Sequence, residues 1–469
     1  MSQYQIVNLL PFFLLLSASG LIASEPGVLT PKNELAPQEP PASLLERDYL
    51  TGDWGGLRPH AVDRGFRFSF EITHEYLANV SGGLRRGGEY NGLIFSGIEL
   101  DLEALAGWGG GLIHADVLYT FGASLSERYV GDDANVSNIN FHNSVRLFDA
   151  WFQQSLFGER LVLRAGQLMF DADFGSSCIN DDLSAGDLFL NSDFGALPIV
   201  SFNVPVPIFA ISAPGAIVRV QPTSWLYFQT AIYDGNPSPG DFGDPSPDSR
   251  IGAPRNDHNV RYRLADDEGF LWAGELGFVV NPPSEAVENL EQLPTAGESL
   301  DSRKSGVRLP GVYKVGFFYH SDEFTDFATG APATGNYGGY LVASQMVCCE
   351  CGDQGLTLFG RVGVAPKGRN VLQCAFDAGA VYKGLIPGRD ADDFGLAFSY
   401  KRYSGDFNAA EAGADHDPCE HEAVLEMTYR FKITGSMSLQ PDVQYVINPA
   451  GASSGSDAWV VGLRSAIIF

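Results

Sequence analysis

The residues that most often carry catalysis do not form a recognisable set in this chain. Ser453 lies in a Gly-x-Ser-x-Gly sequence at 451–455, which in α/β-hydrolases holds a nucleophile on a strand-to-helix turn. Here it falls in a loop between two expected strands, which favours a chance match. The eight histidines are scattered, and neither H-E-x-x-H nor the phosphate-binding G-x-x-x-x-G-K-[ST] occurs. We therefore expect neither an enzyme nor a cofactor.

Two groups of residues contain side chains that can bind metal ions, but their spacing in the sequence matches no known metal site. Cys348 and Cys351 have C-x₂-C spacing, but no second C-x₂-C or H-x₃₋₅-H pair follows to complete a zinc site. A turn disulfide or free thiols are favoured instead. Acidic residues crowd the segments 235–268 and 404–422, and clustered carboxylates bind Ca²⁺. Their spacing matches no EF-hand loop, so we interpret them as solvated acidic surfaces and predict no metal.

Composition excludes two further classes of protein. The 469 residues include 30 Lys and Arg against 57 Asp and Glu, a net charge of −27, and so acidic a surface repels nucleic-acid phosphates. We therefore expect no nucleic-acid partner. The mean hydropathy of −0.03 excludes a helical membrane bundle, which requires several apolar runs of about 20 residues.

The chain alternates apolar and polar residues over most of its length. Between Gly65 and Leu77, five apolar residues alternate with five polar ones, as in a strand with a different environment on each face. Similar segments recur at 65–80, 89–106, 111–122, 143–157, 160–171, 214–222, 225–234, 269–280, 310–320, 338–348, 355–365, 370–384, 393–403, 420–432, 436–448 and 458–469. The count of 16 is even. Strands of this length would be the elements that position any functional residue.

The connections between these segments indicate how they assemble. Short ones such as 107–110 mostly alternate with long ones such as 172–213, and the chain ends on Phe469. These features are typical of an all-β transmembrane antiparallel barrel in an outer membrane, and they favour it over a soluble sandwich or propeller. The Glu-rich connection 281–309 breaks this alternation of short and long connections, since it is long where a short turn is expected. Either a strand is hidden there or the turn carries an insertion.

The amino terminus predicts export. Residues 1–24 carry no charge and contain the apolar stretch 9–16, followed by small residues, which is typical of a secretory signal peptide. A short anchor helix is the alternative, since no Lys or Arg precedes the stretch. Residues 25–49 contain five prolines, and we interpret them as a flexible periplasmic lead-in. Residues 50–469 then form the β-barrel, in the cell outer membrane of a Gram-negative type of bacterium.

Several ordered motifs run along the chain from residue 50 to residue 451. They are LTGDWGGLR at 50–58, VRLFDAWFQQSLFGERLVLRAGQL at 145–168, FLNSDFGALP at 189–198, APGAIVRVQP at 213–222, AIYDGNP at 231–237 and EMTYRFKITGSMSLQPDVQYVINPAG at 426–451. These motifs resemble those of the OprB family of carbohydrate-selective porins. The resemblance implies a 16-stranded barrel through which sugars diffuse, with an inward-folded loop that narrows the channel. The acidic loops and the cysteine cluster depart from the family pattern.

Strand parity predicts which side chains line such a channel. With the apolar alternate facing lipid, Phe148 points outward, and the expected substrate pathway consists of Arg67, Glu71, Glu99, Asp101, Asp149, Trp151, Gln153 and Arg164. Sugars are neutral and rich in hydroxyl groups, so hydrogen-bonding side chains beside an aromatic ring suit them. The alternative interpretation is a salt-bridge and packing network that stiffens the barrel.

The segment 172–213 is the expected constriction loop. It combines acids and phenylalanines with Pro198, Pro205 and Pro207, and an external loop would need neither apolar rings nor rigid prolines. The residues expected to act there are Asp173, Phe174, Asp187, Phe189, Asp193 and Phe194.

These observations together predict a function. We expect a porin for passive, carbohydrate-selective diffusion of mono- or oligosaccharides into the periplasm. Its partners would be sugars as permeant solutes and outer-membrane lipid, and it would be a monomer or a homotrimer. A general or cation-preferring diffusion pore, driven by the charge of −27, is the alternative.

Overall fold

The computed structural model describes Ser43 and residues 47–177, 185–237, 256, 258–260, 262, 268–281, 309–350, 354–411, 419–451 and 455–469. The expected signal peptide, nearly all of the lead-in and most of the segment 281–309 lie outside the described residues, as does Cys351.

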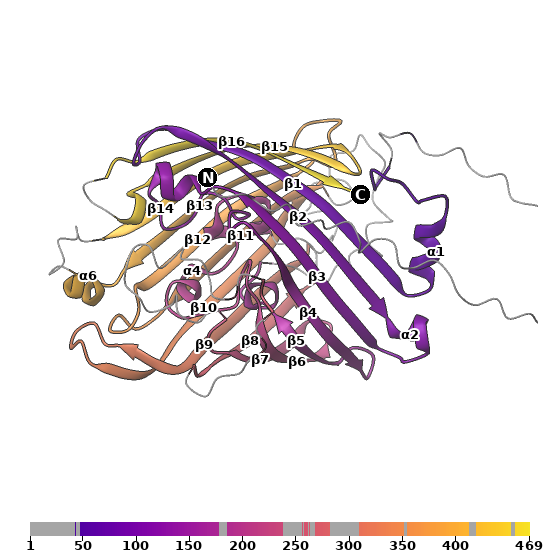
Figure 1. Cartoon of the computed structure of the whole chain (residues 1–469), viewed down its shortest axis with the longest axis horizontal. Helices are drawn as coiled ribbons and strands as arrows, with labels where there is room; N and C mark the ends of the chain where they lie inside the picture. The colour runs from indigo at the N-terminus through magenta and orange to yellow at the C-terminus, as the bar shows by residue number, and fades with distance from the viewer. Residues whose placement is uncertain are drawn as a thin grey trace, which may run out of the picture. The chain divides into compact units, whose positions relative to one another are not determined.

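Sixteen described strands form one closed antiparallel barrel, in which each strand pairs with its neighbours in the sequence and β1 pairs with β16 (Figure 1). The strands are β1 (Phe66–Ser81), β2 (Gly87–Asp101), β3 (Gly111–Gly122), β4 (Ser144–Leu156), β5 (Leu161–Leu168), β6 (Ala213–Thr223), β7 (Leu226–Asp234), β8 (Phe270–Val280), β9 (Gly311–Thr325), β10 (Pro332–Cys349), β11 (Gly355–Val364), β12 (Leu372–Lys383), β13 (Asp393–Tyr403), β14 (His421–Thr434), β15 (Met437–Ile447) and β16 (Ala458–Ile468). Each of the 16 predicted segments overlaps one of these strands.

Helical segments in the described part of the chain are short. They are α1 (Leu57–Asp63), α2 (Leu102–Ala106), α3 (Phe170–Asp173), α4 (Pro198–Ser201), α6 (Gly405–Glu411), the π-helical turn η1 (Ser126–Val130) and the 3₁₀ turns η2 (Ala185–Leu188), η3 (Ser192–Phe194) and η5 (Pro449–Gly451). None of the described helices is long and apolar enough to cross a membrane.

Some strand boundaries differ from the prediction for local reasons. The segment 89–106 was predicted as one strand, but β2 ends at Asp101, whose carboxylate accepts hydrogen bonds from the backbone N–H groups of Glu103 and Ala104 and so caps α2. The β9–β10 hairpin is longer than predicted. Its strands pair as far as Thr325 and Pro332, around a turn in which the Asp326 carboxylate accepts from Thr329.

The barrel has an apolar outer face and a polar inner face. At the β1–β16 seam the paired residues Tyr76 and Leu463 are 55% and 46% exposed. The adjacent pair, Glu75 and Arg464, forms an ion pair of 2.6 Å, and Glu75 is only 1% exposed. The alternation predicted from the sequence therefore separates outward from inward side chains here.

A bulge in the β3–β4 pairing reverses this parity locally. Asp116 pairs with Asp149, but the next residue on β3, Val117, pairs with Leu147. Phe148 is the extra residue, and its ring packs against Phe95 and against Phe209 from the connection between β5 and β6. The prediction that Phe148 faces lipid is therefore wrong, because a one-residue bulge shifts a side chain to the other face.

Two long connections pack against inward-facing side chains, and we name them the β3–β4 loop (123–143) and the β5–β6 loop (169–212). In the β5–β6 loop, α4 contacts β10, β11 and β12. Its apolar residues, including Phe174 and Ile199, share a buried cluster with Tyr340 and Leu372 of the barrel. Both loops therefore occupy part of the lumen.

Candidate functional site

Four of the predicted pathway residues lie in one group on β4 and β5. The Trp151 ring is stacked on the His114 ring from β3, with centroids 4.6 Å apart and planes 12° apart. The guanidinium carbon of Arg164 on β5 lies 4.3 Å from the Trp151 ring centroid. Since β3 and β5 flank β4 on opposite sides, the tryptophan is packed from both sides. It holds its neighbours in place more than it offers a free face to the lumen.

Arg164 connects this group to the β5–β6 loop. Its Nε and Nη2 donate to Gln153 Oε1 at 3.0 and 2.8 Å, and its Nη1 donates to Asp173 Oδ1 at 2.9 Å. The Arg164 and Asp173 side chains are 25% and 18% exposed. Burial raises the pKa of the Asp173 carboxyl and the charge of Arg164 opposes that rise. Partly exposed donors and acceptors thus meet at the contact between wall and loop.

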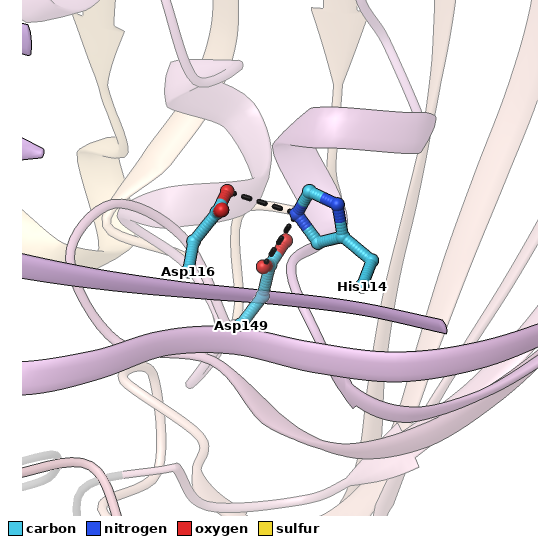
Figure 2. A group of neighbouring side chains, drawn as sticks. All are labelled: His114, Asp116 and Asp149. Carbon is cyan, nitrogen blue, oxygen red and sulfur yellow. Dashed lines mark ion pairs between the residues drawn. The ribbon is translucent and has the colours of Figure 1, made fainter. Parts of the chain in front are cut away.

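Asp149 belongs to the same group through His114. Figure 2 shows Asp149 and Asp116 pointing toward one nitrogen of His114, and the distances from Nε2 are 3.3 Å to Asp149 Oδ1 and 2.9 Å to Asp116 Oδ2. His114 and Asp116 were not among the predicted site residues. Both are polar alternates of a predicted strand, so parity contained the signal that would have found them.

The strand register extends this group into a row of inward side chains. Arg67 pairs with Glu99, Glu99 with His114, and His114 with Trp151. Arg67 and Glu99 form an ion pair of 2.5 Å with the arginine 65% exposed. The structure therefore brings predicted residues from three strands, β1, β2 and β4, together along one rung of the barrel.

The remaining pathway residues lie elsewhere. Glu71 accepts a hydrogen bond of 3.0 Å from Thr73 within β1. It lies four residues beyond Arg67, which is the β1 residue in register with Trp151. Asp101 was predicted to line the pathway, but it caps α2 at the end of β2. Its carboxylate is occupied by backbone N–H groups, because β2 ends at Asp101 and not at the predicted end of the segment 89–106.

The β5–β6 loop is anchored to the far side of the barrel by buried charges. Asp193 lies 3.0 Å from Lys401 Nζ and accepts a hydrogen bond of 2.7 Å from Ser399. The Arg361 guanidinium donates to the carbonyl oxygens of Asp193, Phe194 and Gly195 at 2.9, 2.8 and 2.6 Å. The anchors on β11 and β13 lie seven or more strands from β4 in a ring of sixteen. The loop thus spans from one wall to the other.

Other predicted loop residues are mostly buried. Phe189 and Phe194 pack on each other with centroids 4.9 Å apart, in a cluster with Phe359 of β11. Phe174 stacks on Phe170 at 5.3 Å, whereas Asp187 is exposed. The phenylalanines therefore fix the loop against the wall and do not face the permeant.

The β3–β4 loop was not predicted to enter the barrel. Glu422 of β14 accepts hydrogen bonds from the backbone of Asp133 and Ala134 at 2.9 and 3.1 Å, and Gln444 of β15 donates to the carbonyl of Val136 at 2.9 Å. Burial, followed by the charge of Glu422, raises the pKa of Asp132 in this loop to about 7. Apolar residues in a long polar connection, such as Val136, were the available signal.

Comparisons with known proteins agree with this architecture. Porin B of Pseudomonas aeruginosa is 26% identical over 459 residues, covering 90% of this chain and 91% of that protein. The putative porin QuiX of Acinetobacter baylyi is 22% identical, with 90% and 94% covered. The high-pH structure of Pseudomonas putida OprB has a TM-score of 0.75 and 21% identity, covering 91% of this chain and all of that one.

A family model described as carbohydrate-selective porin, OprB family, matches residues 85–469, which is most of the chain and nearly all of the barrel. The sequence resemblance and the barrel lead to the same assignment. This chain belongs to the OprB family of carbohydrate-selective porins and is an outer-membrane diffusion channel for carbohydrates.

Proposed function

We propose that mono- or oligosaccharides pass the narrowest part of the barrel where Arg164 joins the wall to the β5–β6 loop. The observation that carries the proposal is the contact of Arg164 with Gln153 on the wall and with Asp173 on the loop, at 2.8 and 2.9 Å. The β5–β6 loop, which covers the predicted constriction segment 172–213 except its last residue, would set the width of the channel at that point.

The chemistry of this contact suits a neutral, hydroxyl-rich solute. A guanidinium only donates hydrogen bonds and a carboxylate only accepts them, so Arg164 and Asp173 together match a hydroxyl group in both roles. Trp151, packed by His114 and Arg164, would hold the arginine in one orientation. Because each group is partly exposed, a sugar exchanges hydrogen bonds with them and leaves, as a diffusion channel requires.

Sugar block of single-channel current tests the proposal. In planar bilayers, mono- and oligosaccharides should block the wild-type channel in a concentration-dependent way, and Arg164→Ala should weaken that block several-fold. Arg128→Ala is the matched control, since it also removes one arginine but from an exposed pair with Glu89. Equal block in Arg164→Ala and wild type would refute the role of this contact.

A cation preference is the second candidate property. It is favoured by the net charge of −27 and by carboxylates such as Glu99 and Asp149 on the inner wall. The reversal potential under a KCl gradient measures it, and liposome swelling with sugars and amino acids of similar size measures the selectivity for sugars. Equal swelling would favour a general pore. Since one chain closes its own barrel, both properties are independent of whether the protein is a monomer or a homotrimer.

A further inference from the structure

We propose that His114, Asp116 and Asp149 form a binding site for a divalent transition-metal ion such as Zn²⁺ on the inner wall of the barrel. The spacing of these residues in the sequence follows no metal motif, because they come from two strands and meet only through the strand register. The proposal does not rest on the proposed function, although His114 stacks on Trp151, which packs against Arg164.

The His114 nitrogen and each carboxylate oxygen have the separation that two ligands of one metal ion require. One candidate ligand atom from each residue lies within 4.8 Å of the others, and His114 Nε2 lies 2.9 and 3.3 Å from the two carboxylate oxygens. An ion with bonds of about 2.0 to 2.2 Å places neighbouring ligand atoms roughly 3.0 Å apart in octahedral and 3.4 Å apart in tetrahedral geometry. Both observed distances from His114 fit this range.

The second, independent observation is that carboxylate oxygens of this group lack hydrogen-bond partners. Nε2 of His114 carries at most one proton, yet both carboxylates point toward it (Figure 2). Asp149 Oδ1 is buried and has no hydrogen-bond partner among the described residues, and Asp149 as a whole is only 9% exposed. Asp116 is 6% exposed, and its Oδ1 also has no such partner. A buried carboxylate oxygen without a partner is costly, whereas a cation between His114 Nε2, Asp116 Oδ2 and Asp149 Oδ1 would give Asp149 Oδ1 a partner and attract both carboxylates.

The surroundings provide access and fix the imidazole. The His114 side chain is 21% exposed, so an ion enters from the lumen and keeps positions open for water. The Trp151 ring stacked on His114 restricts the rotation of the imidazole. On the neighbouring strand, Gly97 leaves room for Asp116, since a Cβ at Gly97 would lie 2.1 Å from Asp116 Oδ1.

The donor set predicts which ions bind. Imidazole nitrogen favours Zn²⁺, Cu²⁺, Ni²⁺ and Fe²⁺, whereas Ca²⁺ and Mg²⁺ prefer all-oxygen sites. Three protein ligands with an open position is a common arrangement for Zn²⁺. We therefore expect Zn²⁺ to bind in the presence of a large excess of Ca²⁺.

Calorimetric titration of the folded full chain with Zn²⁺ tests the site. The thiols are first alkylated with N-ethylmaleimide, because cysteine thiolates also bind zinc. We expect about one equivalent to bind to the wild type, and His114→Gln and Asp149→Asn to weaken binding by roughly tenfold or more. His74→Gln, which removes a histidine packed on the outward-facing Tyr90, should bind like the wild type.

Two results would overturn the proposal. One is an unchanged Zn²⁺ affinity in both His114→Gln and Asp149→Asn. The other is that the folded wild type binds no Zn²⁺, which would mean that a protonated His114 between two carboxylates explains the arrangement without a metal. Folding of each variant is checked by circular dichroism. Should His114→Gln not fold, Asp149→Asn carries the test alone, because it keeps the shape of the side chain. Sugar block measured in EDTA tests the proposed function separately.

Discussion

Removal of Arg361 should release the β5–β6 loop from the wall while the barrel stays closed. The arginine is 4% exposed and pairs with Asp377 at 3.0 Å. It also donates to the loop carbonyls of Gly175, Asp193, Phe194 and Gly195, at distances of 2.6 to 3.3 Å. Its bonds to the loop are separate from the backbone ladder of β11, which pairs with β10 and β12 along its whole length.

The expected magnitude follows from burial. Removing one partner of a buried ion pair costs about 3 to 5 kcal/mol, because the other charge is left uncompensated. At about 1.4 kcal/mol for each factor of ten, Arg361→Ala should raise the population of undocked loop by roughly two to three and a half powers of ten. The double variant Arg361→Met with Asp377→Leu removes both charges and the bonds to the loop. It therefore separates the effect of losing the loop anchor from the effect of leaving Asp377 as an uncompensated buried charge.

Single-channel conductance and limited proteolysis report loop release. We expect a larger conductance and faster cleavage within the loop for Arg361→Ala and for the double variant. The control is Lys367→Ala, whose lysine is 64% exposed in its 2.9 Å pair with Asp406, where an exposed pair contributes at most about 1 kcal/mol. Wild-type conductance together with wild-type protease resistance in Arg361→Ala would show that the loop does not depend on this anchor.

Two further predictions concern the β3–β4 loop and the amino terminus. The pKa of Asp132 is raised to about 7 from an ordinary value of 3.8, so the folded protein binds this proton more tightly than the unfolded chain does. The stability that the bound proton contributes is therefore lost as the pH rises from about 4 through about 7. Protease resistance of the loop should therefore be higher at pH 5 than at pH 8, and Asp132→Asn should remove that difference; a wild type equally resistant at both values would contradict this. Mass spectrometry of the protein from outer membranes should find residues 1–24 removed, and an intact Met1 would instead favour the anchor helix.

The sequence by itself determined the strands and their faces. Alternation is a local property, because successive side chains of a strand point to opposite sides, so the 16 segments and the inward position of Glu75 or Arg164 were predictable. The resemblance to the family was also local, carried by short motifs. Where local hydrogen bonds compete with the strand, as at Asp101, the alternation continued past the true end.

Only the tertiary structure decided which inward side chains meet. Register between strands is not encoded in the spacing of either strand, so Arg67, Glu99, His114 and Trp151 form a row only once β1 to β4 are paired. The bulge that turns Phe148 inward is one unpaired residue that no period reveals. The anchors of the β5–β6 loop join residues 168 positions apart, as in the bond from Arg361 to Asp193. Such contacts depend on closure of the whole ring, and no local pattern specifies them.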